Sequence, residues 1–152
     1  MQIAEGLAPT HPAGIVAAWQ RDPSRMAVRF HQDGGWASWT RAELAAAVGR
    51  RVSALRRAGL QPGDRVGVVG PTSVSWLAAA YAIQAAGGVL VGAYPSSAPG
   101  QLRYIYGHSG SRFVFVADDA VTARLMSVLP ELPELERVVV MDGPVPAGAP
   151  AG

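Results

Sequence analysis

The feature that most constrains this fold is a long uncharged stretch: between Arg65 and Arg103 the chain carries no Asp, Glu, Lys or Arg. Within it, Val74–Tyr94 is long enough to be considered as a membrane-spanning segment. The stretch is rich in Ala and Gly rather than Leu, and Gly87 and Gly88 interrupt it. It therefore predicts a helix, a glycine turn and a strand covered on both faces, because buried strands of parallel sheets are continuous apolar runs. We expect no transmembrane segment.

Composition narrows the class of protein. Apolar residues make up 49% of the 152 residues and charged residues 16%, which indicates a folded chain rather than a disordered one. A net charge of only +2 gives no reason to expect a nucleic-acid partner. The absence of Cys excludes disulfides, thiolate nucleophiles and Cys-ligated metals, and because all 13 basic residues are Arg, no Lys can serve a phosphate loop.

The N-terminal third predicts a hairpin and then a helix. Strands are expected at Met26–His31 and Trp36–Trp39, joined by a glycine turn. Thr40 and Glu43 have the spacing of a capping box, and Gly59 is a natural helix stop. The apolar stripe of this helix consists of Leu44, Val48, Val52 and Leu55. Four arginines are expected mostly off that stripe, on a solvated face: Arg50, Arg51, Arg56 and Arg57.

Strands and helices then alternate. Strands are expected at Arg65–Gly70, Val89–Ala93, Arg112–Ala117 and Arg137–Met141, with helices over Val74–Ala86, from a Ser97 cap to His108, and after an Asp118 cap that turns Val121, Leu125 and Leu129 inward. This alternation predicts an α/β fold, with helices on both faces of a parallel sheet and a short N-terminal β-hairpin. We expect residues 10–142 to form one α/β subdomain and the Gly/Pro/Ala-rich residues 143–152 to form a disordered tail.

The residues show no catalytic, cofactor-binding or metal-binding site. Gly67–Gly70 lies inside a predicted strand and Gly87–Gly88 precedes one, so neither is a phosphate loop. The histidines at positions 11, 31 and 108 lack metal-ligand spacing, and Asp118–Asp119 suits a helix start better than acid–base catalysis. Three aromatic residues could line an apolar ligand pocket, although core packing is the favoured use: Trp76, Tyr81 and Tyr94.

Taken in order, several short motifs resemble one known family. They are Trp39–Leu44, Gly59–Val66, Ala82–Val89, Tyr94–Pro95, Ser96–Gln101, Ser109–Arg112 and Leu132–Arg137. Together they are similar to the AMP-forming adenylating enzymes, and most similar to the long-chain fatty acyl-CoA synthetase branch. The resemblance runs from about Pro12 to Asp142 and implies a partial N-terminal subdomain of that fold.

The resemblance implies a reaction that needs more than these residues. Such enzymes use ATP and Mg²⁺ to convert a fatty acid or other carboxylate into an acyl-adenylate, and then transfer the acyl group to coenzyme A. No residue here matches the family's phosphate loop, adenine and ribose motifs, metal-binding Glu or catalytic Lys. We therefore expect a truncated ligase that binds none of these cofactors and is inactive alone.

Two other interpretations stay open at this stage. One is a non-catalytic module that docks onto a separately encoded remainder; the other is an unrelated small nucleotide-binding domain. The first residues, Met1–Gly6, have neither the basic nor the apolar region of a secretion signal. We therefore expect the cytoplasm as the location, with a peripheral position at the membrane as the alternative.

Overall fold

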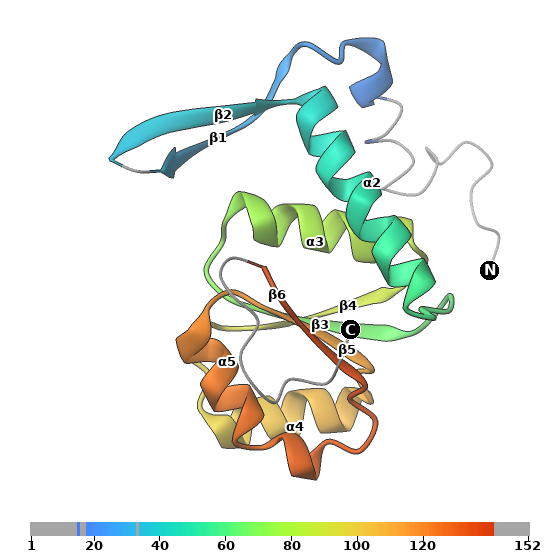
Figure 1. Cartoon of the computed structure of the whole chain (residues 1–152), viewed down its shortest axis with the longest axis vertical. Coiled ribbons are helices and arrows are strands. Elements are labelled where there is room, and N and C mark those ends of the chain that lie inside the picture. The colour runs from blue at the N-terminus through green and yellow to red at the C-terminus, as the bar shows by residue number, and fades with distance from the viewer. Residues whose placement is uncertain (1–14, 16–17, 33, 142–152) are drawn as a thin grey trace, which may run out of the picture.

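An antiparallel hairpin projects from the N-terminal side of the structure (Figure 1). Strands β1 (Met26–Gln32) and β2 (Gly35–Thr40) pair so that Gln32 faces Gly35 and Met26 faces Thr40. The hairpin confirms the prediction. The computed structural model describes residue 15, residues 18–32 and residues 34–141. The predicted start of the subdomain at residue 10 and the predicted tail at residues 143–152 lie outside the described residues.

Helix α2 (Arg41–Arg57) begins where its sequence predicts. The Thr40 hydroxyl accepts a hydrogen bond from the Glu43 amide at 3.3 Å, and the Glu43 carboxylate accepts one from the Thr40 amide at 2.7 Å. These bonds favour the ionised carboxylate and lower the pKa of Glu43. The helix ends just before Gly59, whose φ of 89° is strained for any residue with a Cβ. Both predicted ends are therefore confirmed.

The rest of the chain builds a parallel sheet in the strand order β4-β3-β5-β6. Its strands are β3 (Arg65–Val69), β4 (Val89–Ala93), β5 (Phe113–Val116) and β6 (Arg137–Val140). Its helices are α3 (Val74–Ala85), α4 (Pro99–Ser109) and α5 (Asp119–Met126), followed by a short 3-10 turn at Leu129–Glu131. The uncharged stretch is thus a helix, a turn and a strand, as predicted. In the part of the chain that the structure describes, no helix is long and apolar enough to cross a membrane.

Each face of the sheet carries its own core. Helices α2 and α3 pack on one face, while α4 and α5 pack on the other, which confirms helices on both faces (Figure 1). Alternate residues of β5 divide between them: Phe113 and Phe115 join the α2–α3 core, whereas Val114 joins the α4–α5 core. Gly67 permits the second core to close, because a Cβ at this position would lie 2.5 Å from Cε1 of the buried Tyr106 ring.

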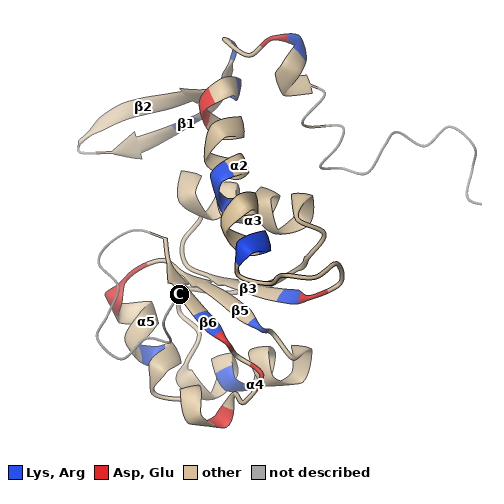
Figure 2. Cartoon of the chain, turned by 45° about the vertical axis from the view of Figure 1, so that its right-hand side comes forward, with Lys and Arg blue, Asp and Glu red and all other residues tan. Residues whose placement is uncertain are grey.

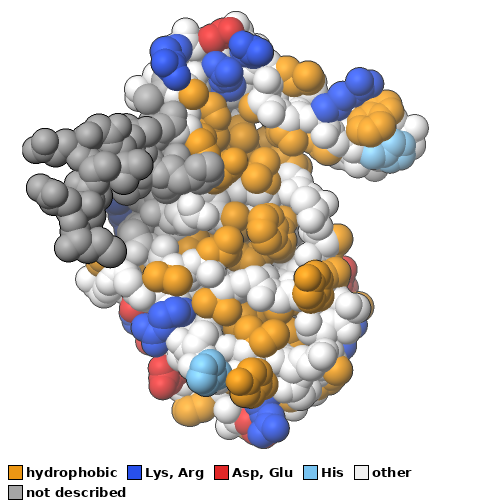
Figure 3. Space-filling view, turned by 180° about the vertical axis from the view of Figure 1, so that it is seen from behind, with side chains coloured by type: hydrophobic (Ala, Val, Ile, Leu, Met, Phe, Trp, Pro, Cys, Tyr) orange, Lys and Arg blue, Asp and Glu red, His pale blue; other side chains and the backbone are white. Residues whose placement is uncertain are grey.

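Strand β4 differs from its prediction. Among the described strands it pairs only with β3, so it lies at an edge of the sheet. Val89 and Gly92 are exposed, Val89 to 49%, and Tyr94 just beyond the strand is 80% exposed, so β4 is not covered on both faces. Within the uncharged stretch, the expected burial is correct for β3. Figure 3 shows apolar side chains across the middle of one face, with charged side chains toward its two ends.

Two local predictions around the later helices are wrong. Helix α4 begins at Pro99 with Ala98 as its N-cap residue, not Ser97. Proline fixes the backbone angle suited to a first helical turn, and Gln101 accepts a hydrogen bond from the Ala98 amide at 2.8 Å. Helix α5 stops at Met126, so Leu129 packs from the 3-10 turn instead.

Candidate functional site at the carboxyl end of the sheet

The strand order places a topological switch point at the carboxyl end of the sheet, between β3 and β5. Strand β3 leads to α3 on one face and β5 leads to α5 on the other, and ligands of open α/β sheets bind where successive connections diverge in this way. Ser73 caps α3 by accepting a hydrogen bond from the Trp76 amide at 3.1 Å. Asp118 caps α5 by accepting one from the Val121 amide at 2.9 Å. Both helix starts therefore already have side-chain caps.

A hollow of about 440 Å³ lies beside this switch point, between the carboxyl ends of β3 and β4. It is lined by Gly70, Pro71, Thr72, Trp76, Gly92, Ala93, Tyr94 and Pro95. None of these residues is charged, and Thr72 supplies an aliphatic hydroxyl. Trp76 and Tyr94 thus share one hollow, whereas Tyr81 packs edge-on against Trp19 with ring centroids 5.8 Å apart. The arrangement suits an apolar or planar group better than a polyphosphate.

A cation close to this hollow is already engaged. Arg124 of α5 donates a hydrogen bond to the carbonyl of Pro95, which ties the loop after β4 to α5. Its Nε is buried and has no hydrogen-bond partner among the described residues. Asp118 and Asp119 are exposed at the start of α5, on the same edge of the sheet. Their carboxylates would oppose the approach of a phosphate.

The opposite end of the sheet carries most of the ion pairs (Figure 2). Arg112 contacts Asp64 and binds both carboxylate oxygens of Glu136, at 2.7 and 2.9 Å. The hydrogen bonds to Glu136 raise the pKa of Arg112, and the bonds from Arg112 lower the pKa of Glu136. Arg65 donates to the carbonyls of Ser109 and Gly110 at 2.6 and 3.0 Å. These contacts join the starts of β3, β5 and β6, so their role is structural.

The remaining candidate residues do not converge. His31 packs edge-on against Trp36 and His108 stacks on Tyr104, while His11 lies outside the described residues. Asp118 acts as the predicted helix cap. Across residues 18–32 and 34–141, no group of three or more His, Cys, Asp or Glu residues could hold a metal ion.

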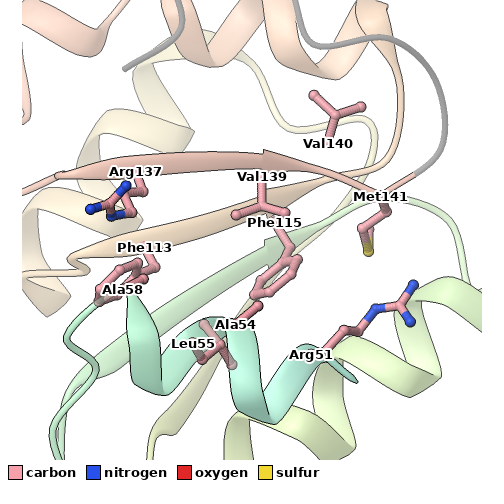
Figure 4. A pocket seen from close by; sticks show the side chains of 10 residues that line it. All are labelled: Arg51, Ala54, Leu55, Ala58, Phe113, Phe115, Arg137, Val139, Val140 and Met141. Atoms are coloured by element: carbon pink, nitrogen blue, oxygen red, sulfur yellow. The ribbon is translucent and has the colours of Figure 1, made fainter. Parts of the chain in front are cut away.

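A second hollow was not predicted and lies on the α2–α3 face of the sheet, between α2 and β6 (Figure 4). We call it the α2–β6 groove; it holds about 260 Å³. Its lining residues are Arg51, Ala54, Leu55, Ala58, Phe113, Phe115, Arg137, Val139, Val140 and Met141.

Arg51 is the exception to the prediction that the arginines of α2 lie mostly off its apolar stripe, which holds for the other three. It is half-buried, lines the groove and donates a hydrogen bond to the Ala47 carbonyl at 3.2 Å. Position 51 follows Val48 by three residues and precedes Leu55 by four, so helical spacing places it on their face. Arg50, by contrast, is exposed, as are Arg56 and Arg57 in the last turn.

The fold of the structure matches the N-terminal part of adenylate-forming enzymes. It superposes with a TM-score of 0.81 on a mutant form of coronafacic acid ligase from Pectobacterium brasiliense, at 16% identity over 91% of this chain and 27% of that one. A long-chain-fatty-acid–CoA ligase from Archaeoglobus fulgidus gives 0.77, at 23% identity over 88% and 27%. At these identities the likeness establishes the fold.

The sequence establishes the family. The family model described as AMP-binding enzyme matches residues 15–151, so this chain belongs to the AMP-binding enzyme family. It is 29% identical to the long-chain-fatty-acid–CoA ligase FadD15 of Mycobacterium tuberculosis over 88% of this chain. It is 31% identical to the human mitochondrial medium-chain acyl-CoA ligase ACSF2 over 84%. The resemblance to adenylating enzymes is confirmed, and the alternative of an unrelated small domain is wrong.

The chain spans under a quarter of these curated relatives, 22% of the mycobacterial ligase and 23% of the human one. Most of each relative therefore has no counterpart in this sequence.

Proposed function

We propose that this chain supplies the N-terminal scaffold of an acyl-CoA synthetase that activates a fatty acid or a related carboxylate with ATP, Mg²⁺ and coenzyme A. The names of the two curated relatives support the substrate class. In this proposal residues 10–142 form the scaffold and residues 143–152 a tail. A cytoplasmic location also belongs to the proposal.

The chain itself contributes no catalytic, cofactor-binding or metal-binding residue in this proposal. Adenylation requires the charge of a polyphosphate to be neutralised by cations, a metal or a cradle of backbone amides. The observation that carries the proposal is the uncharged lining of the carboxyl-end hollow, at the edge where this fold would hold a ligand. Arg124 near that edge is bonded to Pro95, and the start of α5 on the same edge presents carboxylates. The residues present therefore do not fit ATP, and no step is assigned to them.

ATP–pyrophosphate exchange with palmitate tests the proposal. The purified 152-residue chain should give exchange at the level of the blank. A chimera in which this chain replaces the aligned 135-residue segment of the mycobacterial ligase should give palmitate-dependent exchange. Exchange by the chain alone would refute its inactivity. A folded chimera without exchange would refute the scaffold role.

A second candidate is a module that docks onto a separately encoded remainder. Strand β6 favours it, because within the described residues β6 pairs on one side only. Sedimentation of the chain with a separately expressed remainder of the mycobacterial ligase tests this version. A stable complex supports docking in trans, and two independent boundaries contradict it.

A further inference from the structure

The outer edge of β4 has the backbone groups to accept another strand. The amide of Val89 donates to the carbonyl of Asp64, just before β3, at 2.8 Å, so Val89 and every second residue after it face β3. Because backbone groups alternate along a strand, the amides and carbonyls of Leu90 and Gly92 point away from β3. No described strand pairs with that side of β4.

This edge is apolar and lacks the charged residues that usually protect an exposed strand. Val89 is exposed on it, and the exposed rings of Tyr94 and Tyr104 line one hollow beside it. The chain carries no Asp, Glu, Lys or Arg between Arg65 and Arg103. The side of the molecule opposite to that of Figure 1 accordingly shows apolar side chains across its middle (Figure 3). An uncharged, apolar strand is therefore the partner that fits this edge.

Strand β4 is itself such a strand, and its sequence is complementary to itself in side-chain size. In an antiparallel pair, residues whose backbone groups point outward lie opposite each other, which sets the register of two copies about Val91. The opposing pairs are then Leu90 with Gly92, Val89 with Ala93, and Tyr94 with Gly88. Each larger side chain therefore lies opposite a small residue. At Gly92 the space is open, because a Cβ there meets nothing within 4 Å.

The charges of the neighbouring helices also suit a second copy. A two-fold axis perpendicular to the sheet at Val91 keeps α3 of both copies on one face and α4 of both copies on the other. Related helices then run antiparallel, so the positive end of each helix dipole lies toward the negative end of the other, which favours pairing. Helix α3 carries no charged residue, and Arg103 of α4 is paired with Glu131 at 3.1 Å.

We propose that the outer edge of β4 is the interface of a homodimer, in which two copies of this chain pair antiparallel about Val91 and join their four-stranded sheets into one continuous sheet. The amides and carbonyls of Leu90 and Gly92 bond across the two-fold axis. Tyr94 of each copy packs over Gly88 of the other. The proposal goes beyond the function proposed above and does not depend on it, because it concerns only how copies of this chain associate.

Sedimentation equilibrium of the 152-residue chain tests the association. The parent should be a dimer, and Gly92→Glu should weaken the dimer about tenfold or more, because it places a carboxylate opposite Leu90 of the other copy. Gly49→Glu is the matched control, since Gly49 is exposed on α2 and a Cβ there also meets nothing within 4 Å. This control should leave the dimer unchanged. A monomeric parent, open-ended assemblies, or a Gly92→Glu dimer as strong as the control's would each overturn the proposal.

Cysteine cross-linking tests the register, since the chain has no cysteine of its own. Val91→Cys should form a disulfide between copies on mild oxidation, because opposing Cα atoms of a non-hydrogen-bonded antiparallel pair lie about 4.5 Å apart, within disulfide reach. Val89→Cys is the matched control: position 89 is more exposed, but in this register its two copies lie more than about 13 Å apart. Cross-linking of Val89→Cys as readily as Val91→Cys, or none of Val91→Cys in a folded dimer, would refute the pairing about Val91.

Discussion

The close contact between β3 and α4 makes Gly67→Ala the most informative single substitution for the fold. A Cβ there would lie 2.5 Å from Cε1 of Tyr106 and 2.8 Å from Cγ2 of Val114. Both neighbours are buried, with 1% and 0% exposure, so neither can turn into solvent.

The magnitude follows from two opposing effects. Overpacking of a close-packed core costs about 1–3 kcal/mol. Replacing glycine returns about 0.4–1 kcal/mol, because alanine has less conformational freedom in the unfolded chain. The midpoints of these ranges leave a net loss of about 1.3 kcal/mol, with an upper limit of about 2.6 kcal/mol. In a chain of this length each kcal/mol lowers the melting temperature by about 2–4 °C, so we expect a decrease of about 3–5 °C.

Thermal melting followed by circular dichroism measures the loss. Gly92→Ala is the matched control, because a Cβ at Gly92 on the edge strand β4 meets nothing within 4 Å. This control should melt close to the parent. Tyr106→Leu added to Gly67→Ala should show favourable coupling, since the shorter side chain relieves the contact. If Gly67→Ala melts like the parent or like the control, the packing described for this core is wrong.

Three further predictions concern single side chains. Tyr106→Phe removes a buried hydroxyl that has no hydrogen-bond partner in the part of the chain that the structure describes. Because burial raises the pKa of Tyr106, the parent loses stability as pH rises above about 10, where the unfolded phenol ionises. Urea unfolding at neutral and alkaline pH should show a smaller alkaline loss for the variant, and equal losses would contradict this. Ile83→Asp places a carboxylate at a site with 0% exposure and should abolish cooperative melting by circular dichroism, so a parent-like melt would refute the placement of the α2–α3 core. Glu136→Gln should lower the free energy of unfolding measured in urea by about 0.2–1 kcal/mol at neutral pH. Because the pKa of Glu136 is lowered in the folded chain, the stabilisation by its ion pair is present above the pKa of the unfolded chain and is lost as pH falls. A difference in stability between parent and variant that persists at about pH 3 would argue against the ion pair with Arg112.

Much of this fold could be predicted because its signals are local. The Thr40–Glu43 capping box, the glycine after α2 and the Asp118 cap each depend on residues within one or two turns. The predicted start of α4 is wrong because Ser97 as an N-cap and Pro99 as a first helical residue indicate two different starts. Which of them the helix uses depends on backbone geometry that residue spacing does not reveal.

The edge position of β4 and the α2–β6 groove could not be predicted in the same way. An apolar run shows that a strand can be buried, but only the strand order shows whether it has one neighbour or two. The groove joins Arg51 to Val139, which are far apart in sequence. Of this groove, only the helical position of Arg51 gave a signal, since it shares a face with Leu55. For the three aromatic residues the sequence favoured core packing over a pocket. That preference is wrong for Tyr94, which is 80% exposed and lines the carboxyl-end hollow together with Trp76, whereas Tyr81 packs against Trp19.

The central position of β3 has a consequence for the chain as it leaves the ribosome. It is the first strand of the sheet to be synthesised, yet its second neighbour, β5, arrives much later: the bonded pair Asp64 and Arg112 is 48 positions apart. Until β5 is synthesised, one side of the apolar strand β3 has no hydrogen-bonded neighbour. The contact between β3 and β5 also forms slowly, because it closes a long loop. The ion pairs at the starts of β3, β5 and β6 would then stabilise the pairing of β5 and β6, the last strands to be synthesised, in the correct register.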